Sequence, residues 1–145
     1  MRRVEAVLLL TLVGGLLAAC LGGWGFVHDE PLAGPYRLVA VVARDQMIVC
    51  RSLEGGGCSG DGLPDQTVFA AGADERFIVI ARHPSGPFEV RQPGVTEYYF
   101  WKRDPDEAQS RFRPDVRGPY DGVAFEREKA RLVLPSFSVI FEDLQ

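Results

Sequence analysis

Residues 66–82, QTVFAAGADERFIVIAR, give the clearest indication of the fold of this 145-residue chain. Two runs rich in β-branched, aromatic and small apolar residues, 66–71 and 76–82, lie on either side of the turn-like sequence GADE at 72–75. Apolar runs that flank a short turn sequence are typical of two antiparallel strands joined in a hairpin. We therefore predict a β-hairpin over this stretch.

Comparable runs lie on both sides of this hairpin. Residues 36–42 and 47–50 predict a second hairpin, residues 95–103 predict a long strand, and residues 137–141 predict a closing strand. Short strands at this spacing indicate an antiparallel meander, and they are too few for a closed propeller.

Two segments carry the signals of helix starts. Asp104 is followed by Pro105, a residue favoured at the first helical position, which predicts a short helix that ends by Pro114. Asp121 is a candidate N-cap for a second helix at 122–132. We therefore expect an α+β fold, a small antiparallel β-sheet formed by a meander of about five or six strands, with one or two helices packed on it.

The first residues have the layout of an export signal. Two arginines precede an apolar run from 6 to 19, and the run finishes in the sequence Leu17-Ala18-Ala19-Cys20. A positive start, an apolar stretch and small residues are the three parts of a signal peptide. The four final residues resemble the lipobox of small bacterial lipoproteins, and that resemblance implies cleavage before the cysteine and a diacylglyceryl group on its sulfur.

These features divide the chain into three expected parts. They are a signal peptide at 1–19, a lipidated cysteine with a flexible tether at 20–34, and a single globular domain at 35–145. An uncleaved membrane-spanning helix is one alternative, because the low-polarity run continues to residue 27, although three glycines between 22 and 25 weaken a helix. An ordinary secreted protein is the other alternative.

A lipidated Cys20 would place the protein in the cell envelope. Lipoproteins retained in the inner membrane typically have aspartate after the cysteine, whereas this chain has Leu21, so we expect the outer membrane, facing the periplasm, in a host with two membranes. The expected partners are the membrane, through the lipid, and an envelope protein or glycan. The chain has 16 basic and 20 acidic residues, a net charge of −4, so we expect no nucleic-acid partner.

Two further cysteines, Cys50 and Cys58, flank a glycine-rich stretch that would allow their sulfurs to meet. In an oxidising compartment such a pair forms a disulfide, so we predict one here if the chain is exported. Two free thiols are the alternative if it is not. No second cysteine pair or nearby histidine completes a four-ligand metal site.

The sequence predicts no catalytic residues, no metal and no cofactor. The stretch 55–62 has glycines spaced as in a phosphate loop, but Asp61 stands where the motif requires lysine, which favours a surface loop. His28 lies in the expected tether, and His83 ends a predicted strand beside Ser85 with no indication of a triad. The short acidic clusters match no calcium loop.

Four consecutive aromatic residues lie in the long strand. Because side chains alternate along a strand, Tyr98 and Phe100 point to one face while Tyr99 and Trp101 point to the other. One pair belongs in the core, and the other needs a cover, which either a helix or a partner provides. We take Tyr99 and Trp101, with the disulfide loop, as the candidate partner-binding surface.

From the sequence we therefore expect a membrane-anchored lipoprotein of the bacterial envelope, a non-enzymatic binding or structural module. One alternative is a small envelope hydrolase assembled around His83. Another is a single-pass membrane subunit with an exported domain, which differs from the first only at Cys20 and in cleavage.

Overall fold

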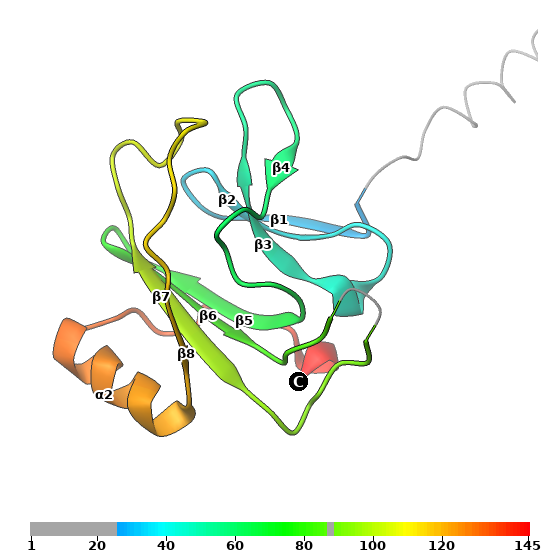
Figure 1. The fold of residues 1–145 in the computed structure, drawn as a ribbon, viewed down its shortest axis with the longest axis vertical. Coiled ribbons are helices and arrows are strands. Elements are labelled where there is room, and N and C mark those ends of the chain that lie inside the picture. The colour runs from blue at the N-terminus through cyan, green and yellow to red at the C-terminus, as the bar shows by residue number, and fades with distance from the viewer. Residues whose placement is uncertain (1–25, 87–88) are drawn as a thin grey trace, which may run out of the picture.

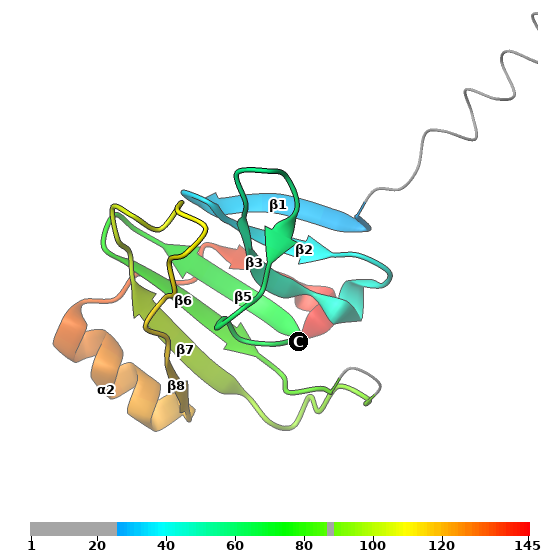
Figure 2. The ribbon, with the colours of Figure 1, turned by 45° about the horizontal axis from the view of Figure 1, so that its top comes forward.

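The computed structural model describes residues 26–86 and 89–145. They form two antiparallel sheets that pack face to face, with a helix on the outer face of one sheet (Figure 1 and Figure 2). The expectation of a small β-rich domain with a helix is confirmed, but the expectation of one sheet is wrong. The sequence pattern shows where strands lie but not how they are divided between sheets.

The first sheet has four strands in sequence order, each antiparallel to the next. They are β1 (His28–Ala33), β2 (Tyr36–Ala40), β3 (Ile48–Ser52) and β4 (Cys58–Ser59). A short 3-10 turn, η1 (Arg44–Gln46), connects β2 to β3.

Strand β1 corrects the expected tether at 20–34, of which only residues 26–34 are described. Residues 28–33 pair with β2, from His28 opposite Ala40 to Ala33 opposite Tyr36. The charged residues and Pro31 hide this strand in the sequence. An edge strand tolerates both, because it needs a partner on one side only.

The second sheet has five strands in the order β8-β7-β6-β5-β9, all antiparallel. They are β5 (Val68–Ala73), β6 (Phe77–Arg82), β7 (Glu97–Lys102), β8 (Arg117–Tyr120) and β9 (Val139–Ile140). The β5–β6 hairpin confirms the prediction for residues 66–82. Its turn is fixed by Asp74, whose carboxylate accepts hydrogen bonds from the backbone N–H groups of Arg76 and Phe77, both at 2.7 Å.

The helix α2 (Gly122–Leu132) has the predicted bounds. Asp121 caps it by accepting a 2.8 Å hydrogen bond from the N–H of Ala124. It ends at Val133, which adopts a left-handed conformation with φ of 54°. The remaining short element, η2 (Glu142–Leu144), closes the chain.

The helix predicted after Asp104 is wrong, because residues 104–116 form a series of turns. The Asp104 carboxylate accepts from the N–H of Asp106 at 2.8 Å, as in an Asx turn. The carbonyl of Glu107, which a helix would pair with the N–H of Arg111, accepts a hydrogen bond from Arg51 instead. Arg51 also donates to the carbonyls of Gln109 and Ser110. A tertiary contact has therefore replaced the local preference.

The sandwich has two ends, which Figure 2 shows at opposite sides of the ribbon. Strand β1 runs from one to the other, a distance of about 20 Å for its six residues. We call the end at which β1 begins the N-terminal end; it comprises residues 26–27, 41–47, 83–86, 89–96 and 141–145. We call the other the loop end; it comprises the connections 34–35, 53–57, 74–76 and 103–116.

Candidate functional site

The two aromatic residues predicted to bind a partner are buried. Trp101 is 0% exposed and Tyr99 is 8% exposed, because both point into the core between the sheets. The Trp101 ring meets the Tyr36 ring edge to face at 5.5 Å between centroids. Neither side chain is available to a partner. The prediction that Tyr99 and Trp101 form a contact surface is therefore wrong.

The opposite face of the aromatic strand carries the helix. Tyr98 stacks on Phe125 of α2 at 4.8 Å, and Phe100 stacks on Tyr120 of β8 at 5.7 Å. The side chains of the aromatic strand therefore alternate between its two faces as predicted. The face with Tyr98 and Phe100 packs against α2 and β8, and the face with Tyr99 and Trp101 packs against the four-stranded sheet.

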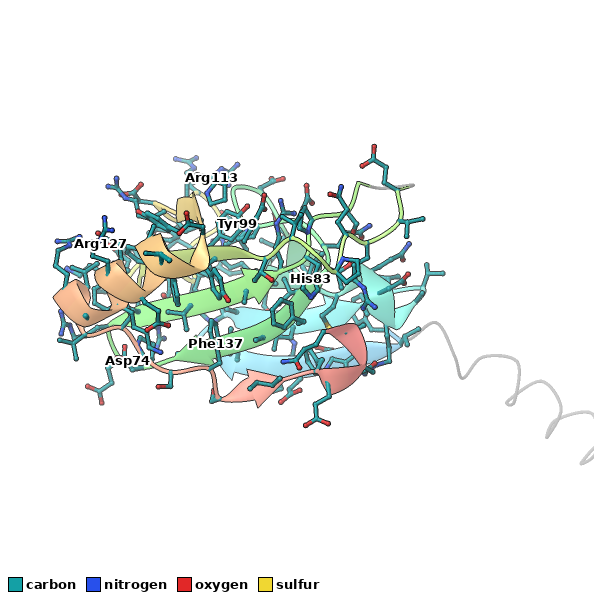
Figure 3. All side chains as sticks on the ribbon, turned by 90° about the horizontal axis from the view of Figure 1, so that it is seen from below. Asp74, His83, Tyr99, Arg113, Arg127 and Phe137 are labelled. Carbon is teal, nitrogen blue, oxygen red and sulfur yellow. A yellow bond between two sulfur atoms is a disulfide. The ribbon has the colours of Figure 1, made fainter. Side chains whose placement is uncertain are left out.

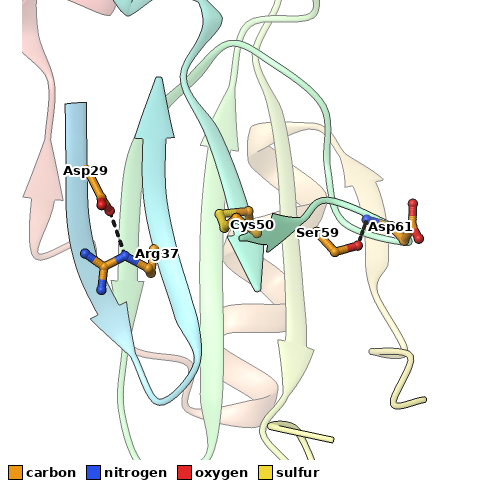
Figure 4. Close-up of a disulfide and its surroundings, with 6 residues drawn as sticks. Asp29, Arg37, Cys50, Ser59 and Asp61 are labelled. Carbon is orange, nitrogen blue, oxygen red and sulfur yellow. Dashed lines mark hydrogen bonds and ion pairs between the residues drawn. A yellow bond between two sulfur atoms is a disulfide. The ribbon is translucent and has the colours of Figure 1, made fainter. Parts of the chain in front are cut away.

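The predicted pairing of Cys50 with Cys58 is confirmed. The structure joins them in a disulfide with a Cα–Cα distance of 5.6 Å, at the base of the β3–β4 hairpin (Figure 4). The enclosed loop turns through backbone hydrogen bonds between Leu53 and its neighbours, including Leu53 N to Gly57 O at 3.2 Å. This hairpin projects from the sandwich at the loop end (Figure 1).

The predicted lipidation site, Cys20, and the predicted signal peptide at 1–19 lie outside the described residues. Among the residues that the structure does describe, no helix is both long enough and apolar enough to cross a membrane.

The two histidines lie at the N-terminal end, which Figure 3 shows for His83, far from Asp74 at the opposite end of its sheet. His83 is 4% exposed; its ring stacks on Phe69, and its Nδ1 donates to the carbonyl of Val95 at 2.8 Å. Its Nε2 is buried and has no hydrogen-bond partner. The Ser85 hydroxyl contacts Thr67 at 3.3 Å instead, so His83 and Ser85 do not form a nucleophile–base pair.

A buried arginine organises the loop end. Arg51 is 3% exposed, and its guanidinium donates to the carbonyls of Glu107 at 3.1 Å, of Gln109, and of Ser110 at 3.4 Å. The guanidinium also lies over the Phe112 ring, 5.9 Å from its centroid. One charged side chain of the first sheet therefore holds the long β7–β8 connection of the second sheet in place.

An ion pair joins the same connection to the β5–β6 turn. The Glu107 carboxylate, which is mostly buried, accepts from Arg103 Nη2 at 2.6 Å and from the N–H of Asp104 at 3.3 Å. Arg103 also donates to the carbonyl of Asp74 at 3.2 Å. The hydrogen bond to Glu107 raises the pKa of the Arg103 guanidinium.

These groups border an open hollow of about 700 Å³, lined by residues 34–35, 75, 103–105 and 107–108. Gly34 is needed at its edge, because its φ is +53° and a Cβ there would lie 2.5 Å from the Glu107 carboxylate oxygen. Tyr36 follows Pro35 in the chain, and its hydroxyl, like the Trp101 indole N–H, is buried without a hydrogen-bond partner. Burial raises the pKa of Tyr36.

Neither Arg51 nor Glu107 was expected from the sequence to organise a site. A signal for Arg51 exists, since it lies two residues after the buried Val49 and alternation places both on the inward face of β3. An arginine at a core-facing position requires buried acceptors, but the sequence does not show that they lie more than fifty residues away.

In the ranges 26–86 and 89–145, no three His, Cys, Asp or Glu side chains are grouped so as to hold a metal ion. The loop end combines fixed loops with an open hollow. No protein-family model, no curated protein and no solved structure matches the chain.

Proposed function

We propose that this chain is a membrane-anchored lipoprotein of the bacterial cell envelope, whose β-sandwich is a non-enzymatic module that binds a partner through its loop end. The observation that carries the proposal is the sequence Leu17-Ala18-Ala19-Cys20 after an apolar run, which resembles a lipobox. Cleavage before Cys20 and acylation of its sulfur would anchor the domain stably, because two or more acyl chains hold a protein on a bilayer.

The disulfide supports an exported location. Cys50 is almost fully buried and bonded to Cys58, and such bonds persist in the periplasm or outside the cell but are rare in the reducing cytosol.

The direction of β1 supports the loop end as the contact surface. The strand begins eight residues after Cys20, at the N-terminal end, and leads away from it to Gly34. A membrane anchor at Cys20 would therefore leave the loop end facing away from the bilayer. Its loops are held by the Arg51 contacts and the disulfide, so little conformational entropy would be lost when a partner, an envelope protein or a glycan, binds.

The anchor is tested by the intact mass of the protein from the membrane fraction, for wild type and Cys20→Ala. We expect the loss of residues 1–19 together with an added lipid mass in the wild type, and neither change in the variant. A chain that keeps its first residues and carries no lipid would refute the anchor and make the first apolar run a membrane helix.

The contact surface is tested by photo-crosslinking in cells. A photoreactive amino acid replaces Glu54 in the β3–β4 loop, and the matched control replaces Glu126, an exposed glutamate on α2. We expect a discrete adduct from position 54 that position 126 does not give. Equal yields at the two positions, or no adduct at either, would remove the loop end as the contact surface.

A further inference from the structure

The N-terminal end exposes a group of apolar side chains. Nine large apolar residues are exposed in the described part of the chain, and four of them lie at one corner of the four-stranded sheet. Their exposed fractions are 45% for Phe26, 52% for Val27, 55% for Val41 and 75% for Val42. We call these four residues the apolar corner.

The pairing of β1 with β2 brings the apolar corner together. His28 lies opposite Ala40 at the last register position of the two strands. Val27 immediately precedes this pair and Val41 immediately follows it, so both leave the sheet at the same place. Exposed apolar side chains that gather at one place are typical of a contact surface.

The chain length between the corner and Cys20 identifies what this surface contacts. Phe26 follows Cys20 by six positions, and a fully extended chain spans at most about 22 Å over that length. If the cysteine sulfur carries lipid, Phe26 is held within about 22 Å of the bilayer surface, and the rest of the apolar corner lies beside it. Such a short connection gives the corner a high effective concentration at the membrane, so a contact too weak to bind alone becomes populated.

The charges around the corner favour a neutral lipid surface. At the N-terminal end Arg44 pairs with Asp143 at 2.8 Å, and Asp45 and Glu142 are further acidic residues beside this pair. The described part of the rim therefore has no excess of basic groups that would attract anionic lipids. An aromatic side chain beside aliphatic ones suits the boundary between head groups and acyl chains.

We propose that the apolar corner of Phe26, Val27, Val41 and Val42 contacts the bilayer surface as a second, non-covalent attachment. This inference rests on the anchoring proposed at Cys20. The contact fixes the orientation of the domain, with the N-terminal end on the lipid and the loop end directed away from it.

The test uses the full chain, purified from the membrane fraction and reconstituted in phosphatidylcholine vesicles with or without brominated acyl chains. The chain has two tryptophans; Trp101 is fully buried, and Trp24 is replaced by phenylalanine to remove its signal. In this background Val42→Trp reports from the corner. Val123→Trp is the matched control, because Val123 is 74% exposed, lies on α2 and is far from the corner.

We expect brominated lipid to reduce the fluorescence of the residue 42 reporter at least two-fold and to leave that of the residue 123 reporter unchanged. No quenching at either position overturns the proposal, and so does equal quenching at both. Absence of quenching together with a concentration-dependent dimer in sedimentation overturns it in favour of a contact between two copies. The intact-mass measurement tests lipidation of Cys20, and the quenching measurement tests the contact of the apolar corner with lipid. The failure of one proposal can therefore be distinguished from the failure of the other.

Discussion

The two ends of the sandwich use charge and apolar surface in opposite ways. At the loop end the charged groups of Arg51 and Glu107 are buried: Arg51 donates to backbone carbonyls, and Glu107 pairs with Arg103. None of the exposed large apolar residues that the structure describes belongs to the loops of this end. At the N-terminal end the ion pairs lie on the surface, while Phe26 and Val42 are exposed. The difference shows that buried polar contacts hold the loops of the loop end in place, whereas the N-terminal end has apolar side chains on its surface.

The largest effect is expected from Arg51→Met, which keeps much of the side chain but removes its donors. Three carbonyls of the β7–β8 connection lose their charged partner, and we expect a loss of about 2–4 kcal/mol in the free energy of unfolding. Urea denaturation measures it. Arg113→Met is the control, because Arg113 is exposed and its contact with Asp61 is 3.9 Å, so it should change stability by less than about 0.5 kcal/mol. Similar losses in both variants would contradict the organising role of Arg51.

Removal of the disulfide by a joint Cys50→Ala and Cys58→Ala change should cost about 2–3 kcal/mol, since the closed loop is short. Denaturation with and without a reductant gives the measurement. The reductant should lower the stability of the wild type to that of the variant and leave the variant unchanged. If the reductant has no effect on the wild type, the bond contributes nothing to the loop end.

A smaller loss, about 1–2 kcal/mol, is expected for Gly34→Ala. The residue has a positive φ, and the new Cβ would lie within 2.6 Å of both the Arg103 and the Glu107 side chains. Gly55→Ala is the matched control at the same end, because no atom lies within 4 Å of the methyl group that alanine would add there. A thermal melt that shows equal shifts for the two variants would refute the close packing at Gly34.

The smallest effect belongs to the N-terminal end and depends on pH. The Arg44 hydrogen bonds lower the pKa of the Asp143 carboxyl below its ordinary value of 3.8. Because the folded pKa is the lower one, the pair stabilises the protein fully above the unfolded pKa, and this contribution disappears as the pH falls through the folded pKa. The melting temperature of Asp143→Asn should therefore lie slightly below that of wild type at about pH 6 and match it at about pH 2. A difference that persists unchanged to acid pH would argue against the ion pair.

An element of this fold was predictable where neighbouring residues in the sequence determine it. The bounds of α2 follow from Asp121 and the residues around it, and the β5–β6 hairpin follows from its two apolar runs, so both were predicted correctly. The division into two sheets depends on contacts between distant strands, such as Tyr36 against Trp101, which no local pattern reveals.

The errors at the site have the same origin. The residues after Asp104 have a helical start signal, but Arg51, far away in the sequence, binds the carbonyl of Glu107, which a helix would need. Tyr99 and Trp101 alternate with their neighbours as predicted, yet their cover is a second sheet that the sequence did not indicate. The disulfide was predictable because its two cysteines are only eight residues apart.

The outer edge of β1 affects whether neighbouring copies of the domain aggregate. One side of β1 pairs with β2, and among the described residues the other side has no strand beside it. Open edges recruit further strands through unpaired N–H groups, but Pro31 has none, and charged residues such as Asp29 and Glu30 are typical of edge strands that resist such pairing. Many copies concentrated on one surface would therefore stay separate instead of merging their sheets into aggregates.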